Sequence, residues 1–574
     1  MIVFRLIPPV AFGLLVLAGC SGDSGPGPDP GNSCGAGGLT LGLGEVRVLQ
    51  GADRSELCLN GGSAGADFTL IPVHTDTGSA NRQLEVIGDG IVAVAATPNP
   101  FEAPASGGPS LSRAAHAAEL TPDRAVHARL RAMERRELGA RLGRARRTIA
   151  PSRALTPDSP SRAVSQVGDR LDLNVAQIGC ATSSIDNRAG VVKAVTQRAV
   201  IVADEANPSG GFTDAEYLAI GNDFDTDVWP VITSNFGTPE DIDENDGRVV
   251  IFFTRAVNEL TESGSSSYVG GFFHPRDLFP RTHADPNFAC DGSNEAEMFY
   301  MLVPDPNGEV NNNKRDKNFV QRITLGVIAH EFQHLINGSL KVENPDASDF
   351  EETWLNEGLS HIAEELMFYH ASGLSPRGNL TLEDIRASAQ RVDAFNAYQT
   401  SNFGRLDEYL PDPEGQSPWA DDDDLATRGA TWQMLRYLAD RKGGSESSFW
   451  RALVSSTRTG VDNLNRESGI NHIDAIRDWA ISVYADDAVS GVPAKYTQPS
   501  WNFRSVYLGF QNHGPYRLKV RKLADNTSTL VSLTGGGAAF VRFGVPASDM
   551  STISIKSQGS APPGNFQLGI LRTR

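Results

Sequence analysis

The chain has 574 residues, which is too long for one hydrophobic core and predicts three or four domains. Its composition, with 40% hydrophobic and 21% charged residues, is typical of globular proteins. A formal net charge of −19 argues against a general nucleic-acid-binding protein, which would usually be basic. The sequence also lacks a P-loop, so we expect neither a nucleic acid nor a nucleotide as partner.

The first residues are typical of an export signal. Arg5 precedes an apolar stretch, residues 6–17, that is too short to span a membrane comfortably. The stretch ends in Leu17-Ala18-Gly19-Cys20, which resembles the lipobox of bacterial lipoproteins. This resemblance implies a signal peptide at 1–19, lipidation of Cys20, and anchoring at the bacterial cell envelope, on the outer membrane or cell surface, with or without later release. The alternative is an ordinary secretory signal that contains a cysteine.

Four further cysteines remain after Cys20, an even number that suggests two disulfides in an exported protein. They allow three pairings, and the sequence alone does not choose among them. We expect Cys34–Cys58 and Cys180–Cys290, because each pair then lies within one predicted domain.

The amino-terminal third changes character three times. Residues 20–38 are rich in Gly, Pro, Ser and Asp and predict a flexible tether. Residues 39–103 contain alternating runs, such as 45–49 and 68–73, that predict a small β-sandwich. Residues 104–165 are rich in Ala and Arg, with a predicted helix at 122–147. This segment is either a solvated linker or a pro-segment that packs on the following acidic domain and is cut at its arginines.

The largest block, residues 166–500, begins with strand-like runs at 199–202 and 248–253. Amphipathic helices follow from about residue 319, so we expect a mostly helical α+β domain. Residues 501–574 return to alternation at 516–520, 540–543 and 552–555, which predicts a second small β-sandwich.

A metal-binding pattern lies within a predicted helix at 322–336, His330-Glu331-Phe332-Gln333-His334. Residues four apart lie on one face of a helix, so the two histidines can converge on one zinc ion. Glu331 projects near the same face and is the expected general base for a zinc-bound water. Asn337-Gly338 predict the end of this helix.

A catalytic zinc ion needs a third protein ligand. The best candidate is Glu357, in a second predicted helix at 349–370, because a reversal near Asn344-Pro345 brings it back to the histidines.

These motifs resemble the gluzincins, a group of zinc peptidases. His330 to Asn337 together with Thr353-Trp354-Leu355-Asn356-Glu357-Gly358-Leu359-Ser360-His361 is most similar to the hyicolysin family. So are the segment at 293–300 and those at 428–430 and 438–440, so the resemblance covers roughly residues 190–490. It implies peptide hydrolysis with one zinc ion on His330, His334 and Glu357, and with Glu331 as base.

The sequence departs from the gluzincin pattern at His361, where thermolysin-like enzymes carry an aspartate that supports a ligand histidine. Glu364, about one turn further on, is a candidate for that supporting role, and a plain surface glutamate is the alternative. The donor that stabilises the oxyanion is not identified by the sequence. Downstream candidates are Tyr369, His370, Tyr398 and Tyr409.

We therefore expect a zinc-dependent endopeptidase that acts on proteins or peptides. An aminopeptidase is less favoured, since the sequence lacks the Gly-x-Met-Glu-Asn segment that such gluzincins use to hold the substrate amine. An inactive surface binding protein on a peptidase scaffold is a further alternative, although the intact Glu331 argues against it.

One other segment has the spacing of a cation site, Asp241-x-Asp243-x-Asn245-Asp246-Gly247. It suits calcium, but the glycine is one place late for an EF-hand and Phe252 stands where the last acidic ligand belongs. A calcium loop and a polar turn before a strand both remain open.

Overall fold

The computed structural model describes Cys34 and residues 37–94, 121–122, 124–143, 165–177, 179–180, 185–265, 267–510 and 516–574. The predicted signal peptide, Cys20, most of the tether and much of the Ala- and Arg-rich segment lie outside the described residues. No helix in the described ranges is both long enough and apolar enough to cross a bilayer.

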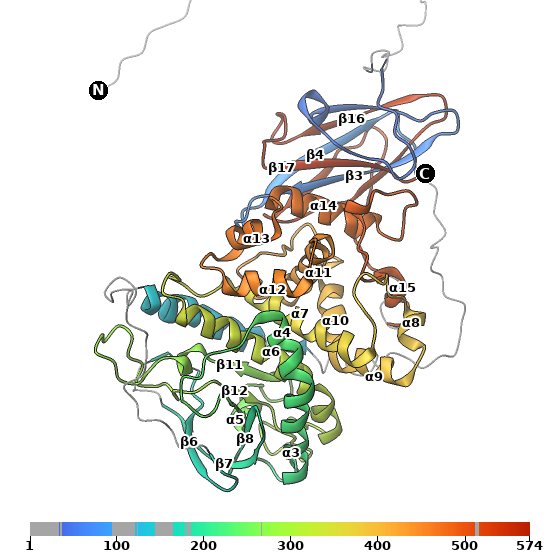
Figure 1. The fold of residues 1–574 in the computed structure, drawn as a ribbon. Helices are drawn as coiled ribbons and strands as arrows, with labels where there is room; N and C mark the ends of the chain where they lie inside the picture. Colours follow the sequence, from blue (N-terminus) through green and yellow to red (C-terminus); the bar gives the residue numbers. More distant parts are fainter. Residues whose placement is uncertain are drawn as a thin grey trace, which may run out of the picture.

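A six-stranded mixed sheet occupies the lower part of the molecule (Figure 1). Its strand order is β11-β12-β9-β8-β7-β6, and β8, β9 and β12 run parallel. The bounds are β6 Arg170–Asn174, β7 Asn187–Val195, β8 Ala199–Asp204, β9 Val249–Phe253, β11 Gly271–Phe273 and β12 Met298–Met301. β9 is buried on both faces, since alternate residues enter two different apolar clusters. This explains its unbroken hydrophobic sequence.

Helices follow the sheet, as the α+β class predicts. Helices α3 (Asp214–Asp223) and α4 (Trp229–Phe236) precede β9, and the main group starts with α6 (Lys317–Glu343) and α7 (Thr353–Ser372). The remainder are α8 Leu382–Arg386, α9 Ala389–Tyr398, α10 Thr400–Tyr409, α11 Leu425–Arg441, α12 Glu446–Ser455, α13 Gly460–Ser468, α14 His472–Ala485 and α15 Phe503–Tyr507. Helices α6 and α7 lie at the centre, between the sheet and the later helices (Figure 1).

The predicted end of the metal-motif helix at Asn337-Gly338 is wrong, because α6 continues to Glu343. Both residues serve packing inside the helix. A Cβ on Gly338 would lie 3.1 Å from the ring of Phe273, tighter than an ordinary contact, so glycine favours this close approach. Asn337 Nδ2 donates a hydrogen bond to Asn356 Oδ1 at 2.7 Å.

The two predicted β-sandwiches, 39–103 and 501–574, are in fact one. Its sheets have the orders β1-β17-β3-β15-β13 and β14-β4-β16-β2, so strands from the two ends of the chain alternate (Figure 1). The amino-terminal strands are β1 Val46–Val48, β2 Glu56–Asn60, β3 Ala66–His74 and β4 Arg82–Asp89. The carboxy-terminal strands are β13 Arg521–Lys522, β14 Thr529–Leu533, β15 Val541–Val545, β16 Met550–Lys556 and β17 Phe566–Arg572. Neither set alone offers two complete sheets that could cover a core.

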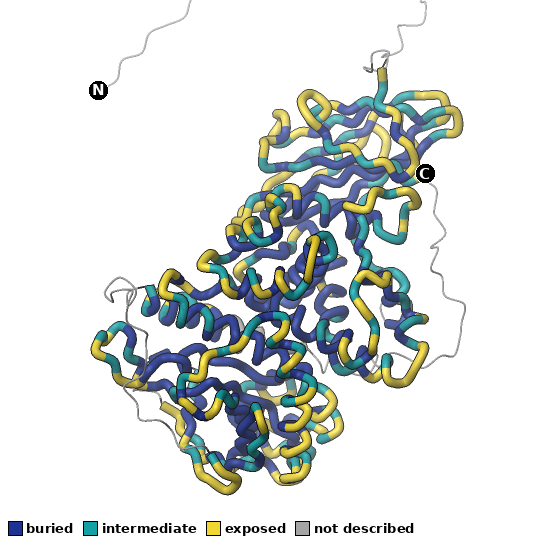
Figure 2. Tube along the Cα trace, viewed as in Figure 1, coloured by how far each residue is buried: buried dark blue, intermediate teal, exposed yellow. Residues whose placement is uncertain are grey.

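The sandwich packs on the helical body through buried apolar contacts. Tyr484 of α14 stacks on Phe540 with ring centroids 5.6 Å apart, and a Cβ on Gly569 would lie 3.0 Å from Ile481. Figure 2 shows the buried chain continuing from the sandwich into the helices. The predicted strand at 516–520 is wrong, since this segment is not a strand and lies against the helical body, where Lys519 N donates to Leu410 O.

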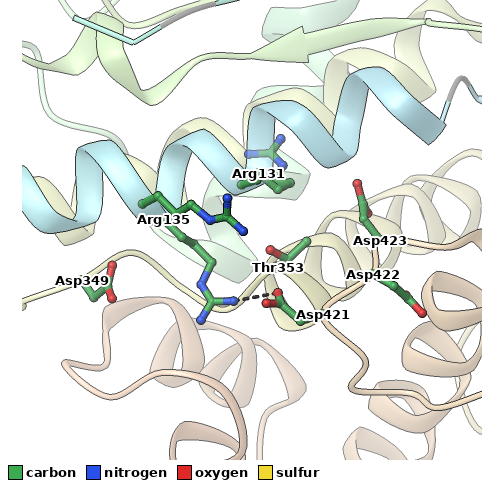
Figure 3. Close-up of a pocket in the computed structure, with 9 residues that line it drawn as sticks. Arg131, Arg135, Asp349, Thr353, Asp421, Asp422 and Asp423 are labelled. Carbon is green, nitrogen blue, oxygen red and sulfur yellow. Dashed lines mark hydrogen bonds and ion pairs between the residues drawn. The ribbon is translucent and has the colours of Figure 1, made fainter. Parts of the chain in front are cut away.

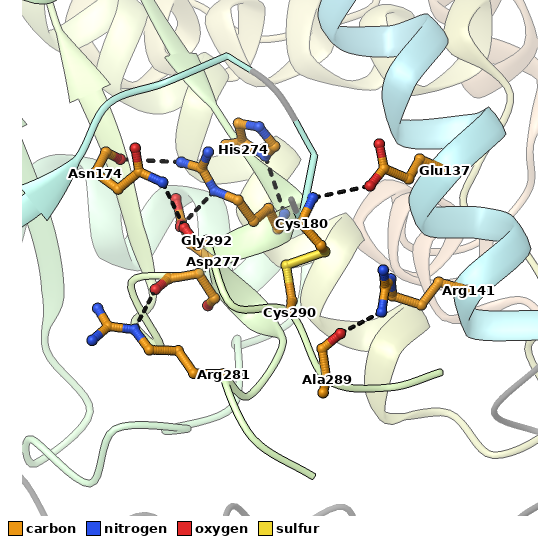
Figure 4. The surroundings of a disulfide bond; sticks show 12 residues. Glu137, Arg141, Asn174, Cys180, His274, Asp277, Arg281, Ala289, Cys290 and Gly292 are labelled. Carbon is orange, nitrogen blue, oxygen red and sulfur yellow. Dashed lines mark hydrogen bonds and ion pairs between the residues drawn. A yellow bond between two sulfur atoms is a disulfide. The ribbon is translucent and has the colours of Figure 1, made fainter. Parts of the chain in front are cut away.

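The expected cysteine pairing is confirmed. Cys34 is bonded to Cys58 in the sandwich, and Cys180 is bonded to Cys290 at the sheet end of the body (Figure 4).

The predicted helix at 122–147 corresponds to α1 (Arg124–Met133), which continues as a π-helical turn, η2 (Glu134–Gly139), and is helical up to residue 143, the last described residue of this segment. It lies along α7 and the loop before α11 (Figure 3). Glu137 Oε1 accepts a hydrogen bond from Cys180 N, and Arg141 donates to Ala289 O beside the same disulfide (Figure 4).

Candidate metal centre

Helix α6 brings His330 and His334 together, as their spacing predicts. Asp316 caps the helix by accepting hydrogen bonds from Asn318 N and Phe319 N, and the helix is buried along its middle turns. The two Nε2 atoms are 3.1 Å apart, and both rings are buried.

Helix α7 places Glu357 against both rings. Its Oε2 lies 3.4 Å from His330 Nε2, and its Oε1 lies 3.6 Å from His334 Nε2. Ligand atoms about 2.0–2.1 Å from a tetrahedral zinc ion lie roughly 3.3 Å from one another. The three side chains therefore fit a zinc ion with two nitrogen ligands and one oxygen ligand.

Both histidines have a hydrogen-bond partner on the ring nitrogen that faces away from the triad. Glu364 Oε1 lies 2.7 Å from His330 Nδ1, where a residue that supports this histidine would stand. Around His334 Nδ1, Asn356 Oδ1 and Ser360 Oγ each lie at 3.0 Å. A partner at Nδ1 fixes the ring orientation and leaves the Nε2 lone pair for a metal.

His361 joins the network around Glu364. Its Nδ1 lies 3.0 Å from Glu364 Oε1 and 3.1 Å from Arg405 Nη1. His330, His361 and Glu364 also converge closely enough to hold an ion. We prefer the triad with Glu357, because both histidines of α6 turn Nε2 toward that carboxylate, whereas Glu364 contacts His330 through Nδ1.

The three side chains of the metal-free triad differ in their protonation. Burial disfavours charge on His330, but hydrogen bonds to Glu357 and Glu364 raise its pKa to about 9. Burial and Arg131 lower the pKa of His334 to about 3, so this ring is neutral, as metal ligation requires. Burial opposes ionisation of Glu357, yet Arg428 and His334 hold its pKa well below the usual range.

Glu331 lies next to His330 on α6. It is buried beside the triad, and its Oε2 has no hydrogen-bond partner. Burial raises the pKa of this carboxyl, against the opposing charges of His330 and Arg131. A carboxyl with a raised pKa can accept a proton from water and release it again.

Two arginines at the site were missed by sequence reasoning. Arg428 of α11 lies 3.0 Å from Glu357 Oε2 and 2.7 Å from Asp423. Arg131 of α1 donates from Nε to Glu357 Oε1 at 3.0 Å and pairs with Glu134 at 2.5 Å. No local pattern identified either residue, although Arg428 belongs to a segment that resembles the hyicolysins.

Arg131 also borders an open pocket of about 330 Å³ between α1 and the body (Figure 3). Arg131 of α1 and two arginines of η2, Arg135 and Arg136, line one side. The acidic run before α11 lines the other, where Arg135 pairs with Asp421 at 2.7 Å. Within that acidic run, Asp424 caps α11, and Asp423 is buried as the partner of Arg428.

None of the four predicted oxyanion donors has a contact with the triad among the contacts of the described residues. Tyr369 donates to Glu365, and His370 pairs with Asp227 at the surface. Tyr398 and Tyr409 are buried in the helical core.

Comparison with known proteins adds one relative. No family model matches the chain. The neutral metalloprotease ShpI of Staphylococcus hyicus is 33% identical over 283 residues, which cover 46% of this chain and 58% of the relative. The chain thus matches little more than half of that protein's length. Over just under half of its length, the chain is thus similar to a protein named as a metalloprotease.

Proposed function

We propose that the chain is a zinc-dependent peptidase of the gluzincin type, similar to the hyicolysins. The observation that carries the proposal is the convergence of His330, His334 and Glu357 at ligand spacing, with Glu331 beside them on the same helix. The similarity to a metalloprotease supports it independently.

The residues of the site suggest how hydrolysis proceeds. Zinc held by the triad would polarise a peptide carbonyl and lower the pKa of a water molecule. Glu331 accepts the proton of that water and passes it to the leaving amine. Glu364 and Asn356 keep the two imidazoles oriented.

The mode of cleavage is tested with peptides that differ only at their amino terminus. We infer an endopeptidase, because the sequence has no segment for holding a substrate amine. Zinc-loaded protein should cleave amino-acetylated peptides as well as free ones, and Glu331→Gln should cleave neither. Cleavage confined to the first bond of free peptides would make it an aminopeptidase. If zinc-loaded wild type cleaves no peptide, the result would favour an inactive binding protein on a peptidase scaffold.

We also propose that α1 and η2 belong to an inhibitory pro-segment. In the described form the site is closed, since Glu357 is fully buried and Arg131 covers it with only 2% of its side chain exposed. Leu130, Leu138 and Leu142 anchor the segment on the body. Departure of this segment would uncover Glu357 for a substrate carbonyl.

A cut placed between the segment and the body tests this closure. A recognition sequence for a specific protease is introduced after Arg147, and peptide cleavage is followed before and after the cut. We expect activity to rise at least tenfold. Arg131→Ala should show part of this activity before the cut, and Arg135→Ala, which loses only a surface pair, should not. Equal activity of the uncut and cut wild type would contradict the proposal.

Finally, we propose that Cys20 anchors the chain to a membrane of the cell envelope through lipid. This rests on the lipobox-like sequence. In a bacterial host, labelled palmitate should enter the wild type and be absent from Cys20→Ala, which should move from the membrane to the soluble fraction. If wild type and Cys20→Ala divide equally between the membrane and soluble fractions, the result would favour an ordinary export signal.

A further inference from the structure

A second group of converging ligands lies away from the histidines, at the sheet edge where two neighbouring parallel strands begin. Asp241 and Asp243 are in the loop before β9, and Glu297 directly precedes β12. The parallel register pairs Met298 with Val250, which sets Glu297 beside that loop. Glu297 thus lies beside two aspartates that precede it by more than fifty positions.

One carboxylate oxygen from each of these three residues lies within 4.8 Å of the others. Glu297 is 2% exposed, and its Oε1 accepts a hydrogen bond from Ile242 N at 2.5 Å. Its Oε2 is buried and has no hydrogen-bond partner. A buried carboxylate oxygen without a partner is costly, and a cation is the natural partner beside two further carboxylates.

Nearby arginines do not supply that charge. Arg248 pairs with Asp246 and donates to the backbone oxygens of Thr196 and Asn245. Arg198 lies over the ring of Trp229, 4.8 Å from its centroid. Within the described chain, no ion pair involves Glu297, and burial together with Asp243 raises its pKa well above the usual range.

We propose that Asp241, Asp243 and Glu297 bind one calcium ion. All donors are oxygens, and oxygen ligands at about 2.3–2.6 Å from calcium can stand up to about 5 Å apart. A cavity of about 70 Å³ adjoins Glu297 and has room for waters that complete the coordination. Glu297, which directly precedes β12, would supply the last acidic ligand that the loop lacks at Phe252.

A plain polar turn accounts for only part of the arrangement. Asp241 accepts hydrogen bonds from Asn245 N and Gly247 N, as an acidic turn residue does. This leaves the buried Glu297 unexplained. Calcium here would join the loop to β12, and the same loop reaches the zinc helix, since Glu240 N donates to Ser339 Oγ at 3.0 Å. The ion would therefore stabilise the loop that contacts α6 at Ser339, without touching the catalytic residues.

The test uses the full chain with Glu331→Gln, so that self-cleavage plays no part. Metals are removed with a chelator, one equivalent of zinc is restored, and calcium chloride is titrated while heat of binding and thermal unfolding are measured. We expect one calcium ion per chain with a Kd of roughly 10⁻⁵ to 10⁻³ M, and a Tm that rises by about 3–5 °C at a hundredfold excess over Kd.

Glu297→Gln and Asp243→Asn should lose this response, and Glu244→Gln, an exposed acid of the same loop, should keep it. A cooperative unfolding transition of Glu297→Gln in the absence of calcium shows that the variant folds. No calcium response in the parent protein, or an undiminished response in Glu297→Gln, would overturn the site. An equal response to magnesium would overturn its assignment to calcium. None of these readouts depends on peptidase activity.

Discussion

The two groups of converging ligands differ in how their charge is compensated. The histidine group sits between helices, with Arg131, Arg428 and Arg405 in contact with its carboxylates. The carboxylate group sits on loops before strands, and Glu297 has no ion pair within the described chain. The first site carries its own counter-charges, whereas the second obtains them only from a bound ion. We therefore expect catalysis to depend on the histidine group and calcium-dependent stability to depend on the carboxylate group.

The largest expected effect concerns chemistry and belongs to the histidine group alone. Glu331→Gln should lower kcat/KM for peptide cleavage by about 10²- to 10⁴-fold, the range of a lost general base. Zinc content, measured by atomic absorption, should stay at one per chain. Glu343→Gln on the same helix and Glu297→Gln should retain activity at 25 °C. An active Glu331→Gln protein would remove the assignment of the base.

Neutralising a carboxylate should act in opposite directions at the two sites. In metal-free protein, Glu357→Gln should lower the free energy of unfolding by about 3 kcal/mol, because Arg131 and Arg428 lose their shared buried partner. Urea unfolding followed by circular dichroism measures the change. Unchanged or increased stability would mean that the arginines do not compensate this site.

The contact between Glu364 and His330 should affect the affinity of the site for zinc. Glu364→Gln removes a charged partner from His330 Nδ1 and should weaken zinc binding about 10- to 100-fold, as measured by competition with a chromophoric chelator. Glu383→Gln, exposed on α8, is the matched control. Wild-type affinity in Glu364→Gln would assign the support to another group.

The smallest effect is a gain at the carboxylate group. The pKa of Glu297 is raised above 4.5 by burial and Asp243, so this residue contributes stability below pH 4.5 that is lost as pH rises through the raised value. Without calcium, Glu297→Gln should therefore be more stable than wild type, by about 1 kcal/mol at pH 8 and less at pH 5. Calcium should reverse the order. A variant less stable than wild type at pH 8 would contradict this view of the site.

The sequence predicted what depends on local spacing. The histidine pair follows from helix periodicity, and Glu364 follows from the turn after His361. Arg131 and Glu297 could not be found this way, because their roles depend on how distant elements pack. Asn337-Gly338 misled for a related reason, since the same residues that end helices also permit close packing inside them. The sandwich strands were found largely in place, but pairing across the whole chain has no local pattern.

That pairing has a consequence for synthesis. Strand β3 is bordered by β17 and β15, and β1 pairs with β17, so most of the first sheet consists of strands made at opposite ends of the chain. A ribosome delivers β1 to β4 several hundred residues before β15 and β17 emerge. The early strands must wait with open edges, a state prone to aggregation. The sandwich can close only after all residues between its amino-terminal and carboxy-terminal strands have been synthesised. Its stability therefore depends on translation of the helical body.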